Sequence, residues 1–94
     1  MGYEVVEIDD QVVQQHYHIC EPFIQEKIGD RFSHPHIEKV WCNKVGQHDY
    51  IYQFHIRTGE FPHHHKFSFL MEVDGHKHKH KHIVEFKEGY HHLY

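Results

Sequence analysis

The sequence predicts an α+β domain in which one α-helix packs across a four- to five-stranded antiparallel β-sheet. One apolar stripe at helical spacing occupies the first third of the chain, and four strand-like segments follow, joined by short turns. Short connections favour antiparallel neighbours, and one helix on one face of such a sheet makes two layers. The length of 94 residues fits one domain over residues 1–94.

The predicted helix begins after Asp9-Asp10, which offer an N-cap, and ends at Gly29-Asp30, a C-cap signal. We expect Pro22 to kink or split this helix, because proline removes a backbone donor. Residues 3–8 precede it as an edge strand or an extended arm. The buried stripe recurs at steps of three and four residues and consists of Val13, Tyr17, Cys20, Ile24 and Ile28.

The strand-like segments span 37–43, 50–57, 66–73 and 77–86. Alternation is clearest in the second segment, where aromatic and aliphatic residues face the core. His55 falls on the opposite side there, and we expect it at the surface. The expected turns lie at 45–49 and 58–62, with a tight hairpin at Asp74-Gly75.

Histidine is unusually frequent, with 15 copies in a chain of formal net charge −4. Free histidine titrates near pH 6.5, to within about a unit, so the chain becomes strongly positive as the pH falls below about 7. No standing lysine or arginine patch occurs, and nucleic acid is therefore not an expected partner. We expect solvated side chains for the histidines of the helix, the connections and the tail: His16, His18, His34, His36, His91 and His92.

Four segments occur in a recognisable order: 21–27 (Glu-Pro-Phe-Ile-Gln-Glu-Lys), 37–40 (Ile-Glu-Lys-Val), 50–59 with its terminal Arg-Thr-Gly, and 88–90 (Glu-Gly-Tyr). In order and spacing they resemble the stefins, a branch of the cystatin superfamily, over about residues 12–90. The resemblance implies a helix wrapped by a four-stranded antiparallel sheet. It also implies a non-catalytic inhibitor that occludes the cleft of papain-like cysteine proteases.

The resemblance further implies a protease-binding edge made of three parts. They are an N-terminal arm, a first hairpin loop and a second hairpin loop, with the residues Gly2, Val45, Gly46, Gln47, His48, Gly75 and His76. The first loop reads Val-Gly-Gln-His-Asp, where stefins have Gln-x-Val-x-Gly, and the second has no apolar residue at its tip. Histidines at such a contact predict an affinity that changes between pH 7.5 and pH 5.5.

A second interpretation is a metal-binding or pH-responsive module on the same scaffold. Histidine and lysine alternate through residues 76–82, and residues two apart on a strand share a face. His78, His80 and His82 would then be ligands for Zn, Ni or Cu. By parity with Phe86 these histidines continue the core-facing row unless a bulge intervenes, and a hairpin centred on Asp74-Gly75 pairs His82 near Phe67.

The two cysteines favour a reducing, cytoplasmic compartment, because two do not make a disulfide framework. Cys20 belongs to the buried stripe, Cys42 lies nearer a turn, and a bridge between them remains open. We find no catalytic motif and expect no enzyme. Ordinary sheet packing is the favoured interpretation of Trp41, over a partner contact.

No apolar run reaches the roughly 20 residues that span a membrane, and no secretory signal is recognisable, so no membrane partner is expected. We expect a monomer. A strand-exchanged dimer is the alternative, with residues 45–49 straightened into a continuous strand. A third interpretation is a scaffold that keeps the fold without the activity.

Overall fold

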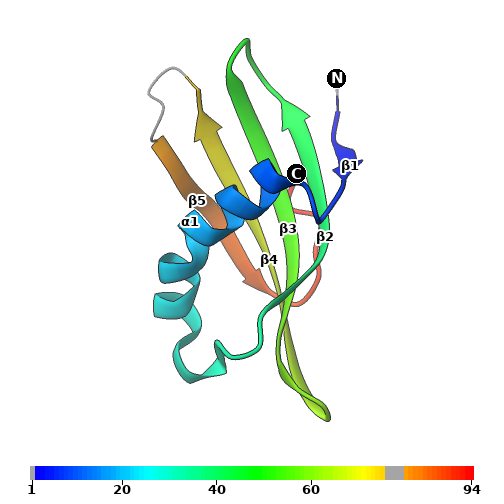
Figure 1. Ribbon diagram of the computed structural model, residues 1–94, viewed down its shortest axis with the longest axis vertical. Coiled ribbons are helices and arrows are strands. Elements are labelled where there is room, and N and C mark those ends of the chain that lie inside the picture. The colour runs from blue at the N-terminus through cyan, green and yellow to red at the C-terminus, as the bar shows by residue number, and fades with distance from the viewer. Residues whose placement is uncertain (1, 76–79) are drawn as a thin grey trace.

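The computed structural model describes residues 2–75 and 80–94, and it places one helix across one face of a five-stranded antiparallel sheet (Figure 1). This confirms the predicted α+β class and agrees with a cystatin-like arrangement. The strands lie in sequence order across the sheet. The elements are β1 (Glu4–Val6), α1 (Gln11–Ile28), a short 3-10 turn (Gly29–Arg31), β2 (His36–Lys44), β3 (Asp49–Glu60), β4 (His63–Asp74) and β5 (His80–Glu88).

Helix α1 begins and ends where the sequence predicts. The Asp10 carboxylate accepts hydrogen bonds from the backbone N–H groups of Val12, at 2.9 Å, and Val13, at 3.1 Å. At the other end Gly29 takes a φ of +57°, which glycine adopts without steric cost. Pro22 does not split the helix, which is continuous through it, although its ribbon bends in Figure 1.

The core lies between α1 and the helix-facing rows of β3 and β4. All five residues of the predicted stripe are buried, including Cys20, and both cysteines are free thiols. The rings of Phe54 and Phe69 stack at a centroid distance of 4.9 Å on adjacent strands. Fully buried residues with them are Ile24, Val40, Ile56, Phe67 and Met71.

The hairpin between β3 and β4 is longer than predicted. The two strands remain paired as far as Glu60 and His63, so the connecting loop is only Phe61-Pro62. The turn expected at 58–62 is therefore wrong over most of its length. Gly59 takes a φ of +86° within β3, and its N–H donates to the Ser33 carbonyl at 2.7 Å. Cross-strand pairing thus overrides the local turn signal.

The connection between β4 and β5 also differs from the prediction. β4 ends at Asp74 and β5 begins at His80, so the connection spans residues 75–79 and is not a two-residue hairpin. His82 consequently pairs with Glu72 and not near Phe67. A β-bulge at Val84 shifts the register between β4 and β5, because Met71 pairs with Ile83 whereas Leu70 pairs with Glu85.

The bulge changes which face of β5 points to the core. Ile83 and Phe86 both pack against the core cluster, whereas Val84 is exposed. His82 is exposed and pairs with an exposed residue of β4, Glu72. The alternative that the sequence left open, a bulge, is therefore the one observed, and because it inverts the alternation His82 does not continue the core-facing row.

The last residues, 89–94, cross the face of the sheet opposite α1, and we call them the C-terminal strap. Gly89, with a φ of +86°, turns the chain out of β5, and Figure 1 shows the strap in red behind the sheet. The N–H of His91 donates to Ser68 Oγ at 2.8 Å, and that of Leu93 donates to Gln53 Oε1 at 2.6 Å. These bonds tie the strap first to β4 and then to β3.

Two histidine expectations are wrong because of such tertiary contacts. His55 does point away from the helix, but it is only 8% exposed. The strap covers it, since the Tyr90 ring stacks on its imidazole. His16, expected in solvent, is also 8% exposed and lies beside the Tyr52 ring. The other five histidines expected in solvent are exposed: His18, His34, His36, His91 and His92.

Candidate functional site

The N-terminal arm and the two hairpin connections lie at one end of the sheet, which we call the hairpin end. Pairing of Glu4 with Cys42 directs the residues before β1 along the last residues of β2, towards the 45–48 loop. Gly75, which follows β4, lies beside that same loop. Figure 1 shows the N-terminus and the β2–β3 loop at the same end of the molecule.

The two hairpin connections touch each other through backbone. The N–H of Val45 donates to the Asp49 carbonyl at 3.0 Å and closes the first loop. The Asp49 carboxylate then accepts from the N–H of Gly75, at 3.3 Å. A Cβ on Gly75 would collide with the backbone oxygen of His48. Only glycine therefore permits this approach of the two connections.

The predicted protease-binding residues differ in exposure. Gly2, Val45, Gln47 and His48 are exposed, and Gly46 and Gly75 are half-buried. His76, like the candidate metal ligand His78, lies outside the described residues.

A shallow groove runs between the arm and the end of β2. Burial raises the pKa of Tyr3, against the lowering effect of a hydrogen bond with Asn43. Burial also raises the pKa of the Cys42 thiol, which hydrogen-bonds with Tyr52. A thiol with a raised pKa is a weak nucleophile at neutral pH, so Cys42 is poorly suited to catalysis. The groove is lined by Gly2, Tyr3, Cys42, Asn43, Lys44 and Tyr50 among others.

Two of the candidate metal ligands, His80 and His82, lie on β5. The exposed His82 is opposite Glu72, and His80 occupies the register position opposite Asp74. Among the residues that the structure describes, no three histidine, cysteine or carboxylate side chains come close enough together to hold a metal ion. The register nevertheless brings carboxylates of β4 opposite histidines of β5, which the sequence reasoning missed because it placed the hairpin differently.

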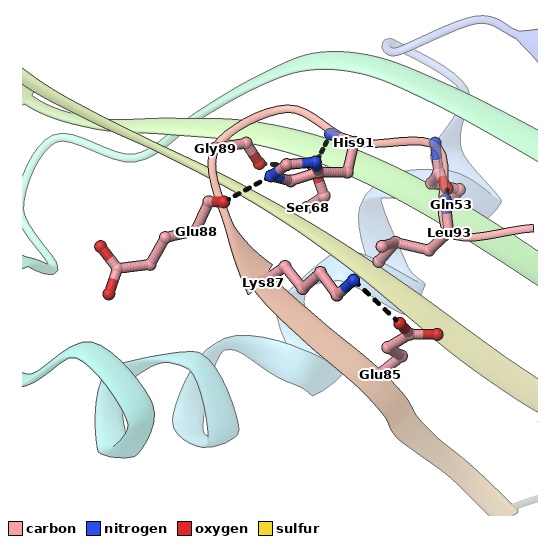
Figure 2. A network of polar contacts seen from close by, with 8 residues as sticks. All are labelled: Gln53, Ser68, Glu85, Lys87, Glu88, Gly89, His91 and Leu93. Atoms are coloured by element: carbon pink, nitrogen blue, oxygen red, sulfur yellow. Dashed lines mark hydrogen bonds and ion pairs between the residues drawn. The ribbon is translucent and has the colours of Figure 1, made fainter.

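A second polar cluster lies under the C-terminal strap, and the sequence reasoning did not find it. The hydroxyl of Ser68 donates to the Gly89 carbonyl at 2.7 Å and accepts from the His91 N–H. Figure 2 shows His91 over Ser68 and Leu93 beside Gln53. The available signal was the polar row on β3 formed by Gln53 and His55. Without a segment that covers it, this row of a central strand would be exposed to solvent.

Comparison with known proteins adds no assignment. No protein-family model matches the chain, and no curated protein matches it. In the described part of the chain, no helix is both long and apolar enough to cross a membrane.

Proposed function

We propose that this protein is a stefin-like, non-catalytic inhibitor of papain-like cysteine proteases that occludes the active-site cleft with its hairpin end. The observation that supports the proposal is the gathering of three segments, distant in sequence, at one end of the sheet. The arm meets the end of β2, and the first connection meets Gly75. Inhibition by occlusion needs such a composite edge and no reacting group.

The chemistry of the hairpin end supports binding over catalysis. Cys42 has a thiol pKa raised by burial, and Cys20 is buried in the core. Val45 is 51% exposed at the start of the first connection and supplies an apolar contact. The proposal includes a cytoplasmic location, which two free thiols favour.

Titration of papain or a cathepsin with the protein at pH 6.5, with a chelator present, tests the proposal. We expect stoichiometric, reversible inhibition. Val45→Asp should weaken it at least tenfold, because an unpaired carboxylate in the interface costs more than the roughly 1.4 kcal/mol that tenfold represents. Val84→Asp is the matched control, since Val84 is 47% exposed on β5. No inhibition at micromolar concentration, or equal loss in both variants, contradicts the proposal.

A second candidate function is binding of Zn, Ni or Cu at His78, His80 and His82, of which His80 and His82 lie on β5. The supporting observation is the register of β4 and β5, with His82 opposite Glu72 and His80 opposite Asp74. Histidine nitrogen and carboxylate oxygen are both ligands of zinc. Added Zn or Ni should then raise the melting temperature by mass action.

Changing His78, His80 and His82 together to Gln should abolish that rise in melting temperature. Changing His63 and His64 to Gln is the control, because these exposed residues lie at the opposite end of β4. A metal-induced rise that survives the first set, or that is lost equally with the control set, contradicts a site on β5.

A further inference from the structure

His55 is a buried titratable group at the centre of the face that the strap covers. It is 8% exposed and lies between neighbours on three sides. From β2 the Trp41 ring approaches it edge-on at 4.7 Å. On β4 its register partner is Ser68, and from the strap the Tyr90 ring stacks on it at 4.5 Å, with 5° between the planes. Removing the strap would open this imidazole to water.

A hydrogen bond of His55 fixes which of its ring nitrogens carries the hydrogen in the neutral form. Its Nε2 lies 2.9 Å from the carbonyl oxygen of His91, which can only accept, so Nε2 carries the hydrogen. The neighbouring Gln53 uses its amide oxygen to accept from the Leu93 N–H. In the neutral ring the basic lone pair is therefore on Nδ1, and protonation places a full positive charge beneath the strap.

The groups that face His55 are mostly cationic or neutral. Lys39 is its register partner on β2 and lies over the Trp41 ring, and Lys66 of β4 lies over the Tyr90 ring. The strap itself contributes His91 and also His92, whose ring centroid lies 6.0 Å from that of His55. Near Tyr90 lie Arg57 of β3 and Glu38 of β2, which partly offset each other as an ion pair at 3.8 Å.

This environment opposes a charge on the ring. Burial lowers the pKa of His55, and the positive charges of His92, Lys39 and His91 lower it further. The hydrogen bond to the His91 carbonyl acts in the opposite direction, since it favours the protonated ring. The state with the strap bound is therefore the one that prefers neutral His55.

We propose that the C-terminal strap is a pH-sensitive element, which leaves the outer face of the sheet when His55 takes up a proton. The proton is taken from solvent onto Nδ1, and the charged ring gains hydration once Tyr90 and His91 move away. The hydrogen bonds of His91 to Ser68 and of Leu93 to Gln53 are then lost together.

Release of the strap would also remove a contact at the hairpin end. The ring of Tyr94, the last residue of the strap, stacks on Tyr3 of the N-terminal arm at 3.9 Å, with 26° between the planes. The rings of His92 and Tyr94 additionally lie near Trp41, at 5.3 and 6.4 Å. Acid pH would therefore free the arm from its stacking partner. The inference goes beyond the proposed inhibition and does not depend on it, because strap release is measured without a protease.

Amide hydrogen exchange, followed by NMR on the full chain between pH 7.5 and pH 5.0, tests the strap. We expect the protection factors of the His91 and Leu93 amides to fall by up to about tenfold per pH unit below roughly pH 6.5. Those of Phe54 and Phe69 in the sheet should change much less. His55→Gln, which keeps an N–H donor without the titration, should remove the dependence. His64→Gln, an exposed control on β4, should keep it.

Constant protection of Leu93 across this range would overturn the proposal, as would an equal fall in the His55→Gln variant. If that variant does not fold, NMR titration of the His55 ring in the unmodified chain tests the proposal instead. A midpoint clearly below 6.5 supports the proposal, and a midpoint at or above about 6.5 overturns it.

Discussion

The backbone oxygen of His48 occupies the space that a side chain at Gly75 would need. This contact joins the first and second hairpin connections, and the Asp49 carboxylate reinforces it by accepting from the Gly75 N–H. The shape of the hairpin end thus depends on one glycine that precedes the histidine-lysine run. Stability measurements can test this dependence without knowledge of a partner.

Gly75→Ala should separate the two connections, because the collision is with backbone and not with a movable side chain. We expect a loss of about 1–3 kcal/mol in the free energy of unfolding, typical of overpacking. In a chain of this size each kcal/mol lowers the melting temperature by about 4–8 °C. Gly2→Ala is the control, since a Cβ there meets nothing within 4 Å. Equal melting temperatures for the two variants would show that the contact is unimportant.

Ser68→Ala should release the start of the strap. The buried Ser68 hydroxyl accepts from the His91 N–H and donates to the Gly89 carbonyl, so its removal leaves both groups without that partner. We expect a loss of about 1–3 kcal/mol, measured by chemical denaturation. The exposed Ser33 offers a control, because its contact with Gly59 uses the backbone carbonyl and survives Ser33→Ala. The prediction fails if Ser68→Ala costs no more than Ser33→Ala.

Gly46→Val should increase strand-exchanged dimers. A Cβ at this position lies 3.1 Å from Asp49 Oδ2, which crowds the closed loop, and a β-branched residue favours extended backbone. Straightening of residues 45–49 would relieve that crowding. Gel filtration should show a larger dimer fraction than for Gln47→Val, which adds a β-branched residue to the same loop without replacing glycine. Identical dimer fractions would argue against a strained hinge.

The free energy of unfolding should decrease as the pH is lowered, in a way that depends on His55. Its pKa is lowered in the folded chain, so between that value and about 6.5 the unfolded chain binds more protons. The free energy of unfolding therefore rises with pH across this window and is largest above it. Because the chain has 15 histidines, the relevant quantity is the difference between the unmodified chain and His55→Gln in urea unfolding. A difference that is constant from pH 7.5 to pH 5.0 would contradict the assignment.

The helix could be predicted closely because its signals are local. The carboxylate of Asp10 and the positive φ of Gly29 act within one turn of the residues they cap. The strand ends were less predictable. Thr58-Gly59 has turn composition, yet pairing with β4 keeps both residues in β3. Local propensity is weaker there than the hydrogen bonds of a paired strand.

The candidate sites divide in the same way. The arm and the two hairpin connections were implied by the resemblance to stefins, and their positions were taken from the order of segments along the chain. The parity of His82 did not follow, because the bulge at Val84 depends on how β5 packs against β4. The burial of His55 depends on a strap that arrives from residues 36 positions further along the chain.

The sequence by itself determined the two-layer α+β architecture, since the apolar stripe of α1 and the alternation in β3 can each bury only one face. It also determined the excess of histidine. The tertiary structure alone decided which histidines are buried, which face of β5 points outward, and which connections touch at Gly75. The physical reason is that burial and contact each depend on two segments that are distant in the sequence. A local pattern describes only one of these two segments.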